Sequence, residues 1–138
     1  MLIEIDFKSG LPVYLQVVEQ VKVAAASGAL RPGEPLPSIR PLAEQLRINR
    51  NTVAKAYAEL EAEGVIESIA GKGCFLKESG SPFSRQTRMQ KLSQAIDAAI
   101  VQAHHSLVSD RDFLGLVKER LVVFAEKKAL EARAQEER

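Results

Sequence analysis

The sequence predicts an α+β fold that is mostly α, and three patterns support this prediction. Two short segments between residues 38 and 64 carry apolar side chains at helical spacing and are joined by a tight turn. A hairpin pattern flanked by glycines follows them and ends near residue 77. After a polar stretch come two longer segments with apolar stripes. We therefore expect a compact unit followed by a two-helix region.

The first residues are expected to form a strand and a helix. Leu2–Asp6 alternates as a short strand, and Pro12 can open a helix that ends near Gly28. The inward side of this helix should consist of Tyr14, Leu15, Val18, Val21 and Ala25. Residues 30–35 contain two prolines and a glycine, which predict a loop.

The first helix of the central pair is expected to begin after Ser38 and to run to about Arg47. Ser38 can cap it, and Pro41 is tolerated because first-turn amides have no intrahelical partner. Its inward side should be Ile39, Leu42, Ala43 and Leu46. This helix would support the one that follows.

The second helix of the pair, about residues 49–63, should divide into an apolar side and a polar start. Asn49 can cap it and Gly64 suits a left-handed stop. The apolar side is formed by Val53, Ala56, Tyr57 and Leu60, with Ala54 at its edge. The polar side chains are Arg50, Asn51 and Thr52, with Lys55 one turn later. Arginine suits guanine O6 and N7, asparagine suits adenine N6 and N7, and threonine suits a thymine methyl or a phosphate. Such a polar start is typical of a recognition helix in the major groove.

The hairpin pattern completes this unit. Residues 65–69 and 74–77 read as strands around a turn at 70–73. Gly71 and Gly73 let the backbone approach a phosphate or the minor-groove floor, and Lys72 supplies a charge. Residues 70–74 are therefore a candidate wing, and the order of elements describes a winged helix-turn-helix that binds duplex DNA.

The distribution of charge agrees with this interpretation better than the total does. The chain has 19 basic and 18 acidic residues, for a formal net charge of +1. Four basic residues and only one acidic residue lie between Arg40 and Lys55, whereas glutamates dominate from Glu59 to Glu67. One face should therefore be positive, and binding to DNA should weaken steeply as salt rises.

A long run of positions carries a resemblance to a known family. The matching residues are 12–16, 27–33, 36–38, Arg40, 42–43, 51–53, 56–57, 60–61, Gly64 and 71–73. With this run, residues 2–77 resemble the DNA-binding domain of the GntR family of bacterial transcription regulators. The resemblance implies that Arg40 and Arg50 contact bases or phosphates in the major groove, and that Gly71 and Lys72 reach the minor groove. It also implies that four polar residues hold the DNA backbone: Ser38, Asn49, Asn51 and Thr52.

Three positions depart from the family pattern. Ile39 stands where many members have glutamate, and Ala54 stands where many have arginine, so the base sequence that is read should differ. Arg47 stands where the turn often has glycine, and a positive φ there would cost on the order of 1 kcal/mol. A basic side chain at this position could still contact the DNA backbone.

The C-terminal part is expected to hold the subunits together. The predicted domains are residues 1–77 and 83–138, with a polar linker at 78–82. A helix at about 82–104 should be followed by a second one that Ser109 and Asp112 cap. Two helices cannot enclose both apolar stripes, so we expect a homodimer, as in the YtrA-like subgroup that this extension resembles. The expected dimer contacts are Leu92, Ile96, Ile100, Phe113, Val117, Leu121 and Phe124.

Other chemistry receives little support from the sequence. No nucleophile motif, carboxylate pair or phosphate loop indicates an enzyme, and no cofactor is expected. His104 and His105 are adjacent and point about 100° apart on a helix, which argues against a metal site. Cys74 is the only cysteine and reads as a packed side chain. Neither a signal peptide nor a membrane span is recognisable, which favours the cytoplasm.

The function expected from the sequence is that of a sequence-specific transcription regulator, acting as a dimeric repressor on a palindromic operator. A deep effector pocket inside one subunit is not expected, while a small-molecule effector at the dimer interface stays open. The alternative is a winged-helix module that contacts another protein, in which Arg40, Arg50, Lys55 and Lys72 would be ordinary solvated charges. Salt dependence and an Arg50→Ala variant distinguish the two.

Overall fold

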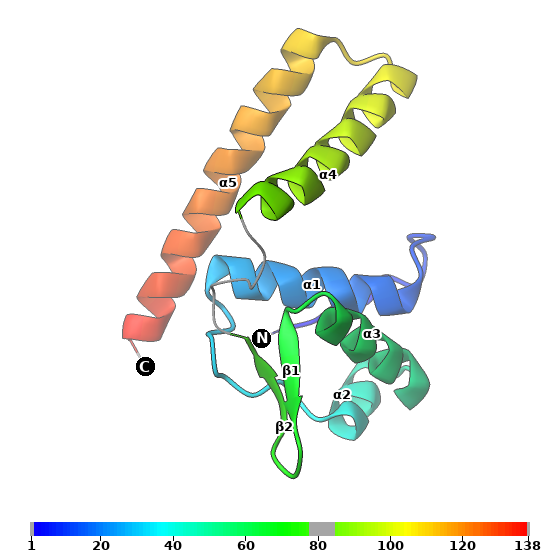
Figure 1. Cartoon of the computed structure of the whole chain (residues 1–138), viewed down its shortest axis with the longest axis vertical. Coiled ribbons are helices and arrows are strands. Elements are labelled where there is room, and N and C mark those ends of the chain that lie inside the picture. The colour runs from blue at the N-terminus through cyan, green and yellow to red at the C-terminus, as the bar shows by residue number, and fades with distance from the viewer. Residues whose placement is uncertain (1, 78–84, 138) are drawn as a thin grey trace. The chain divides into compact units, whose positions relative to one another are not determined.

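The computed structural model describes residues 2–77 and 85–137. Within these ranges the chain forms five helices and one two-stranded antiparallel sheet, as the sequence predicted (Figure 1). The chain divides into two compact units: one is Met1–Ser79 with Leu130–Arg138, and the other is Gly80–Ala129. The predicted linker at 78–82 lies outside the described residues.

The N-terminal unit contains helices α1 (Val13–Ser27), α2 (Ile39–Leu46) and α3 (Arg50–Ala62), and strands β1 (Ile66–Ile69) and β2 (Gly73–Leu76). Its core is built where α3 packs against α1, α2 and β1. The largest side chains with under 2% exposure include Leu60, Ile66, Val17, Val18, Val21 and Val53. Because α3 packs against three other elements of this unit, its exposed side is held in a fixed place.

Helix α1 follows its expected limits, and most of its expected inward side contacts the core. Pro12 precedes it, and Gly28 ends it in the left-handed conformation with φ of 89°. Val18 and Val21 are buried as expected, and Tyr14 and Ala25 pack against the core. Leu15 is only half-buried, while the unpredicted Val17 and Ala24 are buried.

The strand predicted at residues 2–6 was wrong. This segment is not assigned to a strand and has no partner strand among the described residues, and side chains of α1 accept hydrogen bonds from two of its amides. The Gln20 and Gln16 side-chain oxygens accept hydrogen bonds from the Glu4 and Asp6 amides, each at 2.8 Å. The alternation instead places Ile3 in the core, with 5% of its surface exposed.

The loop predicted at 30–35 is confirmed, and it also pairs with β2. The Gly33 and Leu36 amides donate to the carbonyl oxygens of Leu76 and Cys74, at 2.8 and 2.9 Å. In return, the Leu76 amide donates to the Glu34 carbonyl oxygen at 3.1 Å, and Pro35 bridges Phe75. The prolines prevent a full strand, yet their neighbours still pair with β2 and brace the hairpin.

The second unit holds helices α4 (Arg85–His105) and most of α5 (Asp110–Glu136), joined by a short connection (Figure 1). The capping pair predicted for α5 is confirmed, because the Ser109 hydroxyl oxygen accepts from the Asp112 amide at 3.1 Å. No helix within the described ranges is long and apolar enough to cross a membrane.

Candidate nucleic-acid interface

The start of α3 is shaped by its cap. The side-chain oxygen of Asn49 accepts a hydrogen bond from the Asn51 amide at 2.7 Å, and the Asn49 backbone is extended. This occupies the Asn49 side chain within the protein and fixes the first turn. Arg50 and Asn51 are exposed and Thr52 is half-buried. The predicted reading residues are therefore presented side by side on the first turn of a well-anchored helix.

Helix α2 is tied to α3 through a buried phenol. The Tyr57 hydroxyl donates a hydrogen bond to the Pro37 carbonyl oxygen at 2.6 Å. Burial, with a smaller contribution from Cys74, raises the pKa of Tyr57 well above its usual value, so the hydroxyl remains a donor. Ser38 follows Pro37 directly, Arg40 lies two residues further on, and both are exposed. The tie thus fixes the start of α2 relative to the start of α3.

Ser38 lies at the N-cap of α2, but its side chain makes no capping hydrogen bond, so that part of the prediction was wrong. The first turn includes Pro41, which has no amide to donate, and this lowers the number of donors that a cap can satisfy. The Ser38 hydroxyl is exposed and makes no hydrogen bond within the part of the chain that the structure describes. It is available to a ligand, as an N-cap hydroxyl usually is not.

The turn between α2 and α3 contains Arg47 in the left-handed conformation, with φ of 57°. The Ile48 amide donates to the Ala43 carbonyl oxygen at 3.0 Å, and Ile48 packs against the core. This arrangement ends α2 as glycine-terminated helices usually end. The positive φ that the sequence raised as a possibility is confirmed, and the Arg47 side chain is exposed.

The β1–β2 hairpin forms the predicted wing, with Ile66 paired to Leu76 and Ile69 paired to Gly73. The return strand begins one residue earlier than expected, because the Lys72 amide donates to the Ile69 carbonyl oxygen at 2.9 Å, which closes the turn at Lys72 and leaves Gly73 to pair with Ile69. Gly71 and Gly73 have φ of 77° and 107°, which favour glycine. Figure 1 shows the turn of the hairpin extending beyond the helices. Lys72 belongs to this turn and is exposed.

Lys55 has a neighbour that the sequence did not indicate. Its ammonium lies 4.0 Å from the centre of the Tyr14 ring, which α1 supplies. The sequence pattern predicted each helix by itself, but this contact depends on how α1 crosses α3. Tyr14 is therefore an addition to the candidate interface.

The comparisons with known proteins agree with this geometry. The model of the family "Bacterial regulatory proteins, gntR family" matches residues 13–76. The chain is 37% identical over 105 residues to the HTH-type transcriptional repressor YtrA of Bacillus subtilis, covering 76% of this chain and 81% of that protein. This chain belongs to the GntR family. It is therefore a regulatory protein with a DNA-binding winged helix, and its family is not one of enzymes.

Two solved structures extend this likeness. A transcriptional antiterminator from Listeria monocytogenes EGD-e matches with a TM-score of 0.78 and 32% identity, covering 87% of this chain and 90% of that one. The DNA-binding domain of AraR, solved in complex with operator ORX1, matches with a TM-score of 0.50 and 28% identity. That second match covers 55% of this GntR-family chain and 98% of the AraR domain.

A second candidate surface lies on α4 and α5. No described side chain of either helix is buried, and Leu92, Ile96 and Leu121 are 54%, 45% and 66% exposed. The other predicted contact residues are exposed or half-buried: Ile100, Phe113, Val117 and Phe124. In contrast to α1 and α3, these two helices are not closely packed on each other.

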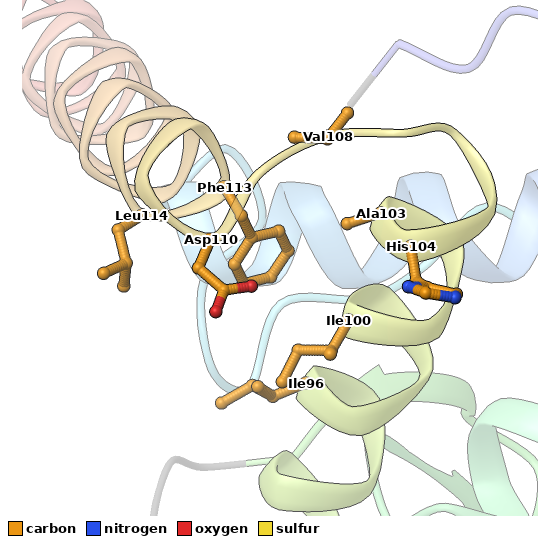
Figure 2. Close-up of a pocket in the computed structure, with 8 residues that line it drawn as sticks. All are labelled: Ile96, Ile100, Ala103, His104, Val108, Asp110, Phe113 and Leu114. Atoms are coloured by element: carbon orange, nitrogen blue, oxygen red, sulfur yellow. The ribbon is translucent and has the colours of Figure 1, made fainter.

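Two adjoining apolar spaces lie between α4 and α5. One of about 550 Å³ is lined by residues that include Ala95, Ala99, Leu116, Val117 and Leu121. The other, of about 470 Å³, has Ile96 and Ile100 on one side and Phe113 on the other (Figure 2). His104 and Asp110 lie at this second space, and no metal-binding cluster occurs in the described ranges. Such a face is large and apolar for a surface that water covers.

Proposed function

We propose that this protein is a transcriptional repressor that binds a palindromic operator as a homodimer. In this proposal α3 enters the major groove and the β1–β2 wing lies at the minor groove. Its relative YtrA is named as a transcriptional repressor, and the AraR domain that it resembles was solved with an operator. Both names concern those proteins, and they support the same role here.

The observation that carries the proposal is the start of α3. The cap formed by Asn49 and the buried anchors of α3 hold Arg50 and Asn51 outward on one turn. This is the part of a recognition helix that reaches base edges in helix-turn-helix proteins. A bidentate arginine reads guanine, and asparagine reads adenine, which gives this turn the means to discriminate between base pairs.

The remaining interface residues have positioning roles in this proposal. Arg40 from α2 and Lys55 from α3 contact bases or phosphates, while Thr52 and the free Ser38 hydroxyl hold the DNA backbone. Gly71, Lys72 and Gly73 bring the wing to the minor groove. Contacts of this second kind fix the register of a protein on DNA without reading its sequence.

The dimer is proposed from the apolar faces of α4 and α5. Both helices leave their stripes exposed, and the space between them is wide enough for side chains from a second copy. A self-complementary patch of this kind is typical of a twofold interface. The expected contacts are Leu92, Ile96, Ile100, Phe113, Val117, Leu121 and Phe124. Two symmetric heads would then bind two half-sites, which explains a palindromic operator.

The direct test is selection of bound fragments from randomised duplex DNA, followed by titration of the selected site. The half-sites should be inverted repeats about one helical turn apart or more. Arg50→Ala should weaken operator binding by about 5- to 150-fold, which corresponds to ~1–3 kcal/mol, and relax the preference at one base pair. Arg111→Ala makes the same charge change at an exposed position of α5 and serves as the control.

The outcome of this test separates the two functions. If the selected fragments show no common sequence, or Arg50→Ala binds as tightly as Arg111→Ala, α3 does not read DNA. A protein-interaction role would then be favoured, with weak binding to all duplexes that salt abolishes.

A further inference from the structure

The contact between Lys55 and Tyr14 is not explained by the match to the GntR family or by the packing of the core. The ammonium sits 4.0 Å from the centre of the aromatic ring, which is the geometry of a cation–π interaction. Lys55 is exposed and Tyr14 is half-buried, so a fixed ring in α1 holds the end of a flexible side chain from α3. A lysine that served only as a solvated surface charge would not need such a defined position.

Lys55 lies on the side of α3 that carries the proposed reading residues. Lys55 follows Asn51 by one helical turn, so both residues lie on the same side of α3. That side is the one that the proposed function turns toward DNA. The ring of Tyr14 thus stands at the border between α1 and the reading surface.

The Tyr14 ring carries no negative charge, so it does not neutralise the Lys55 ammonium. Lys22 also lies near α3, but the Glu63 carboxylate pairs with it at 2.7 Å. In the described part of the chain no carboxylate forms such an ion pair with Lys55. A ring attracts an ammonium through its π face without adding a negative charge, and the ammonium has three N–H donors. At least one donor therefore remains for a phosphate oxygen.

We propose that Tyr14 is a positioning residue that holds the Lys55 ammonium ready for a phosphate of the operator backbone. The inference rests on the proposed function, and it assigns a role to a residue that does not itself read bases. Restraining a lysine before binding removes part of the ordering cost that each immobilised side chain would otherwise add. The gain should appear on every duplex alike, because phosphates carry no sequence information.

The test compares Tyr14→Leu, Tyr14→Phe, Lys55→Ala and the Tyr14→Leu/Lys55→Ala double variant in full-length protein. Binding is measured by fluorescence anisotropy on the selected operator and on an unrelated duplex, over a range of salt concentrations. Circular dichroism melts show whether each variant is folded at the temperature of the titrations. Tyr14→Phe keeps the ring and removes the hydroxyl, whereas Tyr14→Leu removes the π face and keeps an apolar side chain.

Tyr14→Leu should weaken binding to both duplexes by about three- to tenfold, and Tyr14→Phe should bind within about twofold of the parent. Lys55→Ala should lower the slope of log affinity against log salt by about 0.9 for each bound subunit, the value for one phosphate contact. In the Lys55→Ala background, Tyr14→Leu should have no further effect, because the coupled partner is already absent.

Three results would overturn the inference while leaving the proposed function in place. These are additive losses in the double variant, a Tyr14→Phe protein as weak as Tyr14→Leu, or tighter binding by Tyr14→Leu. The last result would mean that the ring withholds Lys55 from DNA. A parent protein that binds no duplex would refute the proposed function itself, and this result is distinguishable from the other three.

Discussion

Arg47 combines a backbone conformation that favours glycine with an exposed basic side chain. Its φ of 57° lies in the left-handed region, which glycine adopts freely and other residues adopt at a cost. The turn nevertheless keeps the hydrogen bond from Ile48 to Ala43 and places Ile48 against the core. An exposed guanidinium therefore lies beside the start of α3 at the expense of some stability.

We expect Arg47→Gly to raise the free energy of unfolding by about 1 kcal/mol, since glycine relieves the strain. For a domain of this size, that shift corresponds to an increase of a few degrees in melting temperature. Arg47→Ala keeps the strain and should melt close to the parent. The same Arg47→Gly protein should bind DNA more weakly if the guanidinium contacts the backbone. A lower melting temperature for Arg47→Gly than for Arg47→Ala would contradict the strain argument.

At single residues, the sequence was informative where the chemistry is local. Asn49 caps α3 through an amide only two positions away, so the residue type and its place before an apolar stripe predicted the bond. The Tyr57–Pro37 hydrogen bond and the Lys55–Tyr14 contact join residues from separate elements. Neither partner could be chosen before the packing of the helices was known.

At the scale of elements, the wing depends on a segment that the sequence did not assign to it. The amides of Gly33 and Leu36 hold β2 on the side away from β1, so the hairpin has support along its length. A two-stranded hairpin alone is marginally stable in water. The brace therefore explains how such short strands can present Lys72 at a defined position.

Replacing the charge at the wing gives an element-scale prediction. Lys72→Ala should weaken binding to operator and unrelated duplexes by a similar factor, about two- to tenfold, and reduce the salt slope by about 0.9 for each bound subunit. Lys77→Ala removes an exposed charge at the base of the same hairpin and should have a smaller effect. A change in preference at one base pair would show that the wing reads sequence instead of holding a phosphate.

The elements that the sequence predicted correctly are those with a strong internal period. Helices α2 and α3 and the hairpin follow their patterns within one or two residues. The segment at 2–6 has the alternation of a strand, but no second strand lies beside it, and Gln16 and Gln20 satisfy its backbone instead. Alternation records which side is buried, whereas a strand also needs a partner that the local sequence does not show.

For the whole molecule, the two units differ in how their apolar residues are covered. The N-terminal unit encloses most of its apolar side chains in one core, and α4 and α5 leave theirs exposed or half-buried. An exposed face of this kind normally marks an interface. The proposed homodimer accounts for it and also predicts a DNA site with two halves.

Leu121→Asp should disrupt this homodimer, because a carboxylate buried at a twofold interface meets its own symmetry mate. Val122→Asp is the matched control: both residues are exposed on α5, at 66% and 58%, but they point about 100° apart. In analytical ultracentrifugation, Leu121→Asp should sediment as a monomer and Val122→Asp as a dimer.

The Leu121→Asp monomer should bind the two-half-site operator about 10²- to 10⁴-fold more weakly, because the two DNA-binding units are no longer linked. Its affinity for a single half-site should be unchanged, which separates loss of assembly from damage to the reading helix. Dimers of both variants would place the interface elsewhere, and a monomer formed only by Val122→Asp would assign it to the other side of α5.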